Sequence, residues 1–468
     1  MKMPTSLKLI AAFSLCAMSG CNVGPKYKKP ETTVKGKFSG QKQGGYASDS
    51  IVAEWWNKFH DSQLNNLIQR ALAGNKDLEI AAARVQEAKA LRNSVRLDYF
   101  PTVTSAASYH NEQRSLAQTG GQAFGQRSVE IYSAGFEAAW EVDIWGRVRH
   151  LNKAAKADVA TAEAVRHDTM VILTAQVASS YLELRGLQNQ LSVAQRNAEN
   201  QRETLKLTES LLQGGRGTEL DTSRARAQLN TTLAAIPIIE GAISKDIHRI
   251  SVLIGEQPTI LDRDLNKAKP MPSMPSLVHI GKPAELLRRR PDIEAAEKSL
   301  EAATERVGVA VADLFPKVTF NGTAALQANS LGGSSSGATS FGPNISWAAF
   351  NLGRVQAQID AAGARAKGQL ASYEKTVLIA LEETEDALVD YGRTRARRDY
   401  LAEAAKASEQ AAKLARERYQ NGVADFLTVL DAERTMLLAQ SELAASETNT
   451  ATALIAIYKA LGGGWEGR

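Results

Sequence analysis

The side chains that most often carry enzyme chemistry are few and widely spaced in this chain of 468 residues. No glycine-rich loop with a lysine is present to cradle a phosphate. The six histidines show no close pairing of the kind that a metal site needs; they are His60, His110, His150, His167, His248 and His279. We therefore expect no catalytic residue, no metal and no cofactor, and we predict that the protein is not an enzyme.

Cys21 is the residue with a predicted covalent role. An apolar run from Leu9 to Ala17 follows two lysines, and Met-Ser-Gly then leads directly into Cys21. Small residues before a cysteine resemble the lipobox of bacterial lipoproteins, in which the thiol takes a diacylglyceryl group before cleavage. We expect residues 1–20 to be the signal peptide and Cys21 to carry diacylglyceryl and N-acyl lipid. The alternative is a plain secretory signal that is cut nearby.

The mature chain is expected to keep one cysteine, because Cys16 leaves with the signal, so it can form no internal disulfide. An aspartate directly after the lipidated cysteine favours retention of bacterial lipoproteins in the inner membrane. This chain has Asn22 at that position, which is compatible with the outer membrane. No later stretch approaches the ~18 apolar residues that a transmembrane helix needs. Any membrane attachment must therefore come from the lipid, from β-strands, or from both.

The chain contains the same pattern twice. The segments that begin at Asp77 and Asp98 recur 215 residues later at Asp292 and Asp313. Further along, Trp140 and the Gly-Arg-Val of 146–148 recur at a shift of 207 residues. The difference between the two shifts falls in a Gly/Gln/Ser-rich stretch after Thr104, whose counterpart is 329–340. A length that varies between repeats predicts a surface loop.

Each repeat predicts the same order of elements. A helix (77–100 and 292–315) ends at a proline, two extended segments follow, and a proline-free helical run (147–213 and 354–420) leads through a glycine turn to a return helix. A run of 67 residues would be about 100 Å long as a helix. Apolar and small residues recur in heptads along both runs, which favours close helix packing.

The extended segments alternate apolar and polar residues over about ten positions, as in the wall of a transmembrane barrel. The segments from Tyr132 to Trp140 and from Val318 to Leu326 show this alternation. Four strands leave two open edges, which a bilayer does not tolerate, and the smallest transmembrane barrels have about eight strands. If these strands span a membrane, several chains must share one barrel. Two ordinary soluble hairpins are the alternative.

Five segments together resemble the TolC-like outer membrane efflux proteins, and in particular the NodT-type lipoprotein branch that serves resistance-nodulation-division pumps. They are Cys21–Pro30, Leu286–Glu297, Leu314–Pro316, Phe350–Arg354 and Arg418–Gly422, the last together with Leu430–Ala432. The resemblance implies a mainly α fold with a small β part. It also implies a homotrimer in which a 12-stranded outer-membrane β-barrel is continuous with a long periplasmic α-helical barrel, each chain holding two internal structural repeats.

The repeats and the resemblance together predict how the chain is divided. After the signal peptide come an N-terminal acylated segment with an equatorial part, repeat 1, a linker, repeat 2 and a C-terminal tail. The corresponding residues are 1–20, 21–75, 76–254, 255–283, 284–461 and 462–468.

The resemblance implies that the turns at the periplasmic tips contact an adaptor protein and close the resting channel. The predicted adaptor contacts are Gly214, Gly215, Arg418, Tyr419 and Gly422, and the predicted gate residues are Leu427, Asp431 and Asp221. Thr428 and Ala424 replace an acid and an arginine of some relatives, so we expect a hydrophobic closure without their salt-bridge latch. Asp221 could equally cap a helix, and Asp431 could be an exposed acid on a helix face.

The predicted function is that of an outer membrane channel of a tripartite efflux pump. It would passively conduct drugs, toxic compounds or metal ions from the periplasm to the exterior. Its expected partners are a periplasmic adaptor (membrane fusion) protein, an inner-membrane pump of the resistance-nodulation-division type and outer membrane lipid. A net charge of only +5 without a dense basic tract argues against nucleic acid. The alternatives are a protein-secretion duct and a membrane-tethered coiled-coil structural lipoprotein.

Overall fold

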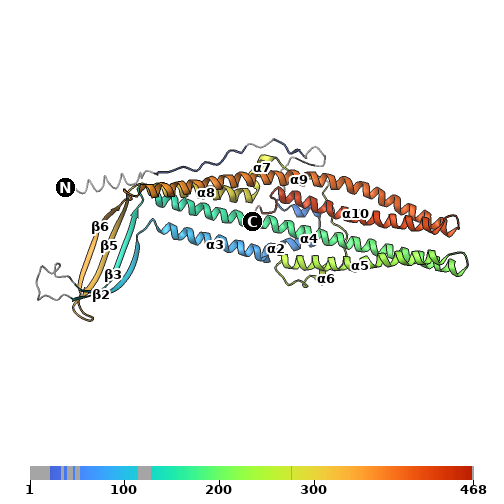
Figure 1. Cartoon of the computed structure of the whole chain (residues 1–468), viewed down its shortest axis with the longest axis horizontal. Helices are drawn as coiled ribbons and strands as arrows, with labels where there is room; N and C mark the ends of the chain where they lie inside the picture. The colour runs from blue at the N-terminus through green and yellow to red at the C-terminus, as the bar shows by residue number, and fades with distance from the viewer. Residues whose placement is uncertain are drawn as a thin grey trace. The chain divides into compact units, whose positions relative to one another are not determined.

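The computed structural model describes residues 22–32, 36–39, 46–47, 53–113, 128–275 and 277–465. The predicted signal peptide, Cys21 and the last three residues of the tail lie outside the described residues, as does the first inter-strand loop at 114–127. Within the described part, helices predominate and a small sheet accompanies them (Figure 1). The helical content and the small sheet agree with the predicted fold class.

The predicted repeat is confirmed by the order of the elements (Figure 1). Both halves run helix, strand, strand, long helix, return helix. The first half is α3 (Lys76–Leu97), β2 (Thr102–Gln113), β3 (Ser128–Val142), α4 (Arg147–Gln213) and α5 (Glu219–Leu253). The second half is α8 (Pro291–Ala312), β5 (Lys317–Ala328), β6 (Ser336–Ser346), α9 (Leu352–Gln420) and α10 (Phe426–Ala460).

Shorter elements precede and join the two halves. They are β1 (Tyr46–Ala47), η2 (Trp55–Phe59), α2 (Ser62–Gly74), α6 (Asp262–Leu265), β4 (Val278–His279) and α7 (Pro283–Arg289). β1 pairs with β4 in parallel, which ties the N-terminal segment to the linker between the repeats. Among the described residues, no helix is both long enough and apolar enough to cross a membrane.

Two details of the sequence prediction were wrong. α3 and α8 end three residues before the predicted ends, at Leu97 and Ala312, and a turn precedes each proline. The predicted loop at 329–340 is shorter than expected, because its small residues from Ser336 onward pair with β5. Gly, Ser, Ala and Thr gave no periodic signal there, and only the partner strand fixes them as a strand.

The chain forms two compact units, and each takes segments from both repeats. Unit 1 comprises residues up to 31 together with 84–163 and 295–374. Unit 2 comprises 32–83, 164–294 and 375–468. The long helices α4 and α9 each contribute to both units, which is why neither unit coincides with a repeat.

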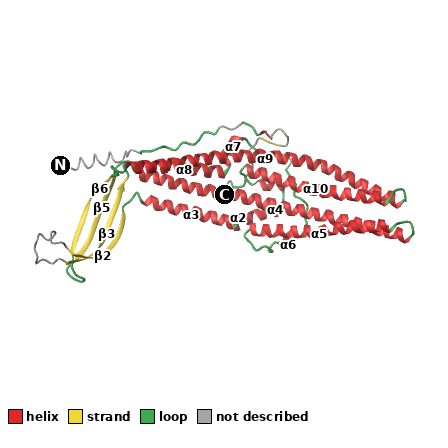
Figure 2. Ribbon diagram, in the orientation of Figure 1, coloured by secondary structure: helices red, strands yellow, loops and turns green. Residues whose placement is uncertain are grey.

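Unit 1 contains a four-stranded antiparallel sheet in the order β2-β3-β5-β6 (Figure 2). Eleven or more residue pairs join each neighbouring pair of strands without a break. The two hairpins, one from each repeat, meet through β3 and β5. β2 and β6 are therefore the outer strands of the described sheet, and each is paired on one side.

The register separates the side chains of this sheet by polarity. Directly opposite residues share a face, so Phe136 lies with Ser105 and Ala324, and Trp140 lies with Phe320. The apolar face continues on β6 with Phe341 and Ile345, whose exposed fractions are 81% and 67%. The other face carries Thr, Ser, Asn, Gln and Glu. The predicted alternation is therefore confirmed, with large apolar side chains exposed.

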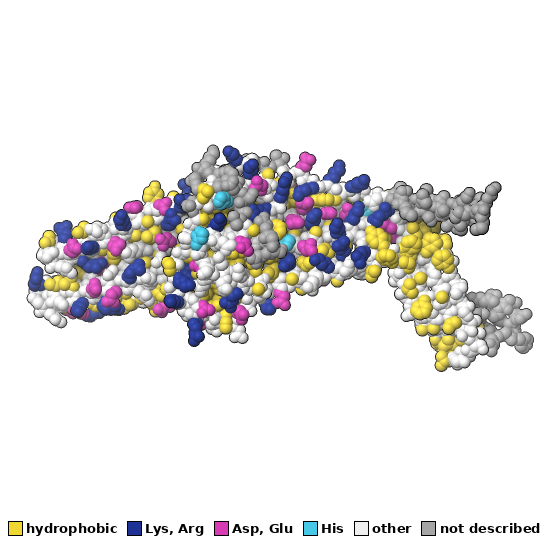
Figure 3. All heavy atoms as spheres, turned by 180° about the vertical axis from the view of Figure 1, so that it is seen from behind, with side chains coloured by type: hydrophobic (Ala, Val, Ile, Leu, Met, Phe, Trp, Pro, Cys, Tyr) yellow, Lys and Arg dark blue, Asp and Glu magenta, His cyan; other side chains and the backbone are white. Residues whose placement is uncertain are grey.

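The face of the sheet that is visible in Figure 3 carries hydrophobic and uncharged side chains, whereas charged side chains gather on the helices. Tryptophans mark the rim at which the strands meet the helices. The indole N–H of Trp140 donates to the Tyr99 carbonyl, and that of Trp347 donates to the Leu314 carbonyl, both at 3.0 Å. These two contacts are equivalent in the two repeats.

Unit 2 has an aromatic core beneath its long helices. Trp55, Trp56 and Phe59 of η2 are almost fully buried, and Trp55 stacks on Tyr458 of α10 with the ring centroids 4.9 Å apart. Helix α4 also approaches α10 closely, because Gly186 faces the side chain of Thr448. A methyl group at position 186 would overlap that threonine. The small residues of the predicted seam thus allow the helices to approach closely.

We predict that Gly186→Ala destabilises the protein although alanine is the better helix former. Overlap with Thr448 should cost about 1–3 kcal/mol and outweigh the ~1 kcal/mol gain in helix propensity. The matched control is Gly241→Ala, because Gly241 in α5 has open space around it and should gain stability. Thermal unfolding in detergent measures both. A Gly186→Ala protein as stable as the Gly241→Ala protein would contradict the close approach.

Candidate functional site

The two turns that end the long helices belong to unit 2 and were predicted to be functional. After α4, the amide of Gly215 donates to the Leu212 carbonyl at 3.0 Å, and the amide of Arg216 donates to the Leu211 carbonyl at 2.8 Å. After α9, the amide of Gly422 donates to the Tyr419 carbonyl at 3.0 Å. Gly215 and Gly422 have φ values of +69° and +71°, a conformation that favours glycine. The structure thus places these predicted contact residues on two equivalent turns.

A side-chain cap starts the return helix after each turn. Thr218 caps α5, and its hydroxyl donates to the Asp221 carboxylate at 2.6 Å while accepting from the Asp221 amide. Asp425 caps α10, accepting from the amide and the hydroxyl of Thr428. These hydrogen bonds lower the pKa of Asp425. In the α5 cap the threonine comes first and the aspartate follows three residues later, whereas in the α10 cap the aspartate comes first and the threonine follows.

The capping geometry bears on two residues that the sequence left open. Asp221 is a partner in the α5 cap, one of its two predicted roles, and is partly exposed. Thr428 completes the α10 cap. The predicted gate residues Leu427 and Asp431 are one helical turn apart on an exposed face of α10, and Leu427 is 53% exposed. Their gate role stays a prediction.

An apolar cluster supports the turns from inside. Phe426 and Val429 of α10 pack with Ala225 and Ala415. The ring of Tyr419 lies against Phe426 with the ring centroids 5.6 Å apart, and burial raises the pKa of Tyr419. A groove between the two turns is lined by Leu211, Arg216, Asp221, Arg224, Tyr419, Gly422, Ala424, Asp425, Phe426 and Leu427. Gly214, Arg418 and the apolar Val423 are exposed next to it.

Sequence reasoning missed a buried acid close to this site. Glu433 of α10 accepts a hydrogen bond from the Thr204 hydroxyl of α4 at 2.7 Å and forms an ion pair with Arg416 of α9 at 3.1 Å. Burial raises the pKa of Glu433, and its two partners oppose that rise. The sequence contained one signal for this contact. Glu433 is a charged residue on the same face of α10 as the apolar Phe426, Val429 and Met436. This contact joins three helices near the turns.

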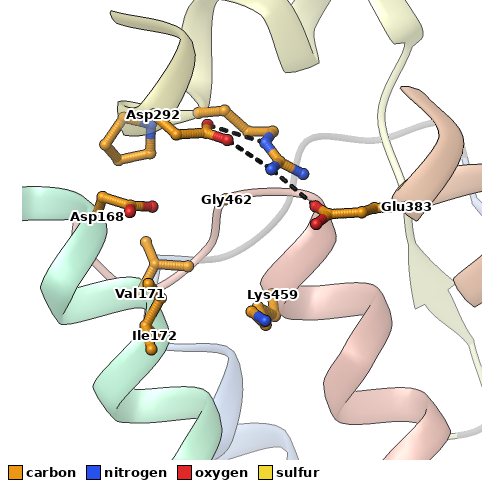
Figure 4. Close-up of a pocket in the computed structure, with 9 residues that line it drawn as sticks. Asp168, Val171, Ile172, Asp292, Glu383, Lys459 and Gly462 are labelled. Carbon is orange, nitrogen blue, oxygen red and sulfur yellow. Dashed lines mark hydrogen bonds and ion pairs between the residues drawn. The ribbon is translucent and has the colours of Figure 1, made fainter. Parts of the chain in front are cut away.

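A second polar site in unit 2 surrounds Arg290, just before α8 (Figure 4). Its guanidinium forms two hydrogen bonds with Asp292, one with Glu383 at 2.8 Å and one with the Ala460 carbonyl at 2.9 Å. A cavity of about 180 Å³ lies beside it and is also lined by Asp168, Lys459 and Gly462. Arg290 thus joins the start of α8, the middle of α9 and the end of α10, which is a structural role.

Asp168 of α4 faces the same cavity (Figure 4). Burial and then the Asp292 carboxylate raise the pKa of Asp168 to about 6 in the folded protein. Arg290 and Lys459 oppose that rise. Within the described part of the chain, no three His, Cys, Asp or Glu side chains are grouped so that they could hold a metal ion.

Comparison with known proteins identifies relatives along almost the whole chain. The family described as "Outer membrane efflux protein" matches residues 67–256 and 283–463. The solvent efflux pump outer membrane protein SrpC of Pseudomonas putida is 33% identical over 98% of each chain. Nodulation protein T of Rhizobium leguminosarum bv. trifolii is 28% identical over 97% of this chain and 96% of its own. The solved outer-membrane channel OprN is 41% identical, with a TM-score of 0.89 over 95% of this chain and 100% of its own.

The raised pKa of Asp168 predicts a pH-dependent effect of Asp168→Asn. The folded state binds the proton more tightly than the unfolded state, so the free energy of unfolding falls as pH rises from about 4 to about 6. The neutral asparagine avoids this loss. We expect it to stabilise the protein by on the order of 1 kcal/mol at pH 8, a figure discounted for partial exposure, and hardly at pH 4.

Thermal unfolding at the two pH values measures the effect. The control is Asp386→Asn, which removes an exposed carboxyl on α9 that does not line this cavity. An Asp168→Asn effect of the same size at both pH values would show that the carboxylate charge is not its cause.

Proposed function

The chain belongs to the outer membrane efflux protein family, and from this membership we propose that three copies form one channel that docks on a periplasmic adaptor and an inner-membrane pump. As an efflux channel of the outer membrane, it conducts small molecules outward from the periplasm. The pump would be of the resistance-nodulation-division type, as the resemblance seen in the sequence implies. Selection among drugs, toxic compounds and metal ions would belong to the pump, and the duct itself would catalyse nothing.

The observation that carries this proposal is the sheet of unit 1. It has one apolar face with exposed large side chains, one polar face, and outer strands β2 and β6 that are each paired on one side. In hydrocarbon, every backbone polar group must be hydrogen-bonded, so these outer edges need partner strands. Three copies of four strands would make a closed sheet of twelve. The apolar face would then meet lipid and the polar face would line the channel.

The helices support the same arrangement on the periplasmic side. α4 and α9 have 67 and 69 residues, and the return helices α5 and α10 have 35 each. Helices of this length, with small residues along the seam, suit the wall of a long tunnel. The exposed turns at Gly215 and Gly422 would offer the adaptor a surface with apolar residues such as Val423, which is 65% exposed.

The gate would be formed by three copies of Leu427 and Asp431 around the channel axis. A narrow ring of leucines excludes water, and a ring of aspartates attracts cations and repels anions. Asp221 would stand beside this ring while it completes the α5 cap. Position 428 carries a threonine and not a second acid, which favours a hydrophobic closure.

We predict that Leu427→Ala combined with Asp431→Ala raises single-channel conductance severalfold in planar bilayers, because the smaller side chains widen the ring at its narrowest part. The control is Val389→Ala, since Val389 is also exposed but lies on α9 far from the turns. Unchanged conductance in the double variant, or an equal rise in the control, would contradict the gate assignment.

Covalent lipid on Cys21 is the proposed anchor. It would hold the chain at the outer membrane together with the sheet, and Asn22 in the following position is compatible with that membrane. The lipid would be joined through the Cys21 sulfur and the new N-terminal amine.

We predict that deletion of the gene raises susceptibility to drugs or metals and that the wild-type chain restores resistance. Cys21→Ala should incorporate no labelled palmitate and should reach the outer membrane in smaller amounts, because one of two attachments is lost. Resistance and labelling are measured separately, which distinguishes export from anchoring. Equal palmitate labelling of wild type and Cys21→Ala would refute the lipid site.

A further inference from the structure

The segment that directly follows Cys21 is seated along α8 in unit 1. We refer to Asn22–Glu31 as the strap. At one end, the Val23 amide donates to the Trp145 carbonyl at 3.1 Å. At the other end, Lys29 forms an ion pair with Glu297 at 2.6 Å, and the Tyr27 hydroxyl approaches the same carboxylate. Burial and Glu297 raise the pKa of Tyr27.

The strap follows a single stripe of α8, which the spacing of its partners defines. Glu297, Glu305 and Gly308 lie on one face of α8, because they are separated by eight and three residues. Val23 lies near Glu305 and Gly308, whereas Lys29 lies near Glu297. The strap therefore runs antiparallel to α8, and several side chains hold it in one register.

The most buried contact of the strap is with His150 of α4, whose side chain is 1% exposed. Its Nε2 lies 2.8 Å from the Val23 carbonyl oxygen, and its Nδ1 lies 2.5 Å from the Glu305 carboxyl. A carbonyl oxygen only accepts, so Nε2 must carry a hydrogen. Glu305 and Nδ1 then share a further proton. Nε2 has this acceptor only while the strap is in place, since Val23 supplies it, whereas the contact between Nδ1 and Glu305 does not involve the strap.

Two glycines allow the strap to pack closely against α8 and α4. Gly24 has a φ value of +104°, and a Cβ at this position would lie 2.7 Å from the Gly308 Cα. A Cβ at Gly308 would lie 2.6 Å from the His150 ring. Gly24, Gly308 and the imidazole are therefore stacked without space for a methyl group between them. This packing accounts for glycine in the Val23-Gly24-Pro25 sequence.

We infer that His150, Glu305 and Gly308 form a latch for the strap, which makes the lipidated N-terminus leave the protein at one fixed point. That point is Trp145, between the end of β3 and the start of α4, where Trp140 and Trp347 also mark the rim of the sheet. The lipid would then enter the bilayer at the rim on the helix side of the strands. His150 is a positioning residue in this scheme, which rests on the proposed lipidation of Cys21.

The test uses limited proteolysis of the full-length, acylated protein in mild detergent. Endoproteinase Lys-C cuts after Lys26 and Lys28 only when the strap is released, and mass spectrometry detects the acylated N-terminal fragment. Cleavage follows the population of the open form when opening and closing are fast. Loss of the hydrogen bond between His150 Nε2 and the Val23 carbonyl should therefore increase the cleavage rate by up to about tenfold in His150→Leu.

Gly308→Ala provides a second variant that leaves the polar groups unchanged. Its methyl group would lie 2.6 Å from the His150 ring, so it should push the imidazole away from the Val23 carbonyl and accelerate cleavage to a similar degree, while alanine favours the helix itself. The matched control is Gly368→Ala in α9, where nothing lies within 4 Å of the new methyl group. If His150→Leu fails to assemble, Gly308→Ala decides the outcome. Cleavage of Gly308→Ala at the rate of wild type or of Gly368→Ala would overturn the latch.

Cys21→Ser separates the latch from the lipid. The latch contacts lie after residue 21, so Cys21→Ser should resist Lys-C as well as wild type does. Absence of palmitate from the wild-type protein would refute the lipid while leaving the cleavage result intact. Rapid cleavage of Cys21→Ser would show that the lipid itself holds the strap, and would overturn the latch.

Discussion

Backbone hydrogen bonding in the sheet is the constraint on which the rest of the architecture depends. Within β2, β3, β5 and β6, the register is continuous, so the sheet satisfies its interior groups and leaves its two outer edges to partners. An apolar face with Phe136 and Phe341 exposed has no favourable place in water. In a bilayer, lipid would cover the apolar face. The backbone N–H and C=O groups at the two outer edges would then have to be hydrogen-bonded to further strands. Assembly of several copies follows from these two demands together.

The long helices meet a different constraint, because a helix of this length needs tertiary packing along its whole face. Small residues provide it by allowing close approach. Gly186 of α4 lies directly against Thr448 of α10, and Gly308 of α8 lies against His150 of α4. Each contact depends on the absence of a methyl group. Glycine in these helices therefore allows close packing, although it lowers their intrinsic helix propensity.

Buried charged groups fix which elements meet. Arg290 joins α8, α9 and the end of α10, Glu433 joins α10 to α4 and α9, and the His150–Glu305 pair joins α4, α8 and the strap. Such pairs contribute little net stability, because desolvation offsets much of their attraction. Removing one member would, however, leave its partner buried without compensation. We therefore regard these groups as determinants of register and orientation, placed where several segments from distant parts of the sequence converge.

The sequence by itself determined the elements and their faces. The bounds of α4 were predicted to the residue, since a proline-free heptad run lies between Gly-Arg-Val and a glycine turn. The faces of β3 and β5 followed from their alternation, because the two-residue period of a strand is a local property of the backbone. The duplicated pattern likewise gave the order of the elements, and the glycines gave the positions of the two turns.

Tertiary structure alone decided which segments meet. The pairing of β3 with β5 across the repeats, the extension of β6 back to Ser336 and the contact of Glu433 with Thr204 and Arg416 depend on residues far apart in the chain. Periodicity reports which face of an element is apolar. The partner that covers that face is selected by shape and hydrogen bonding in three dimensions, and these leave no periodic trace in the sequence.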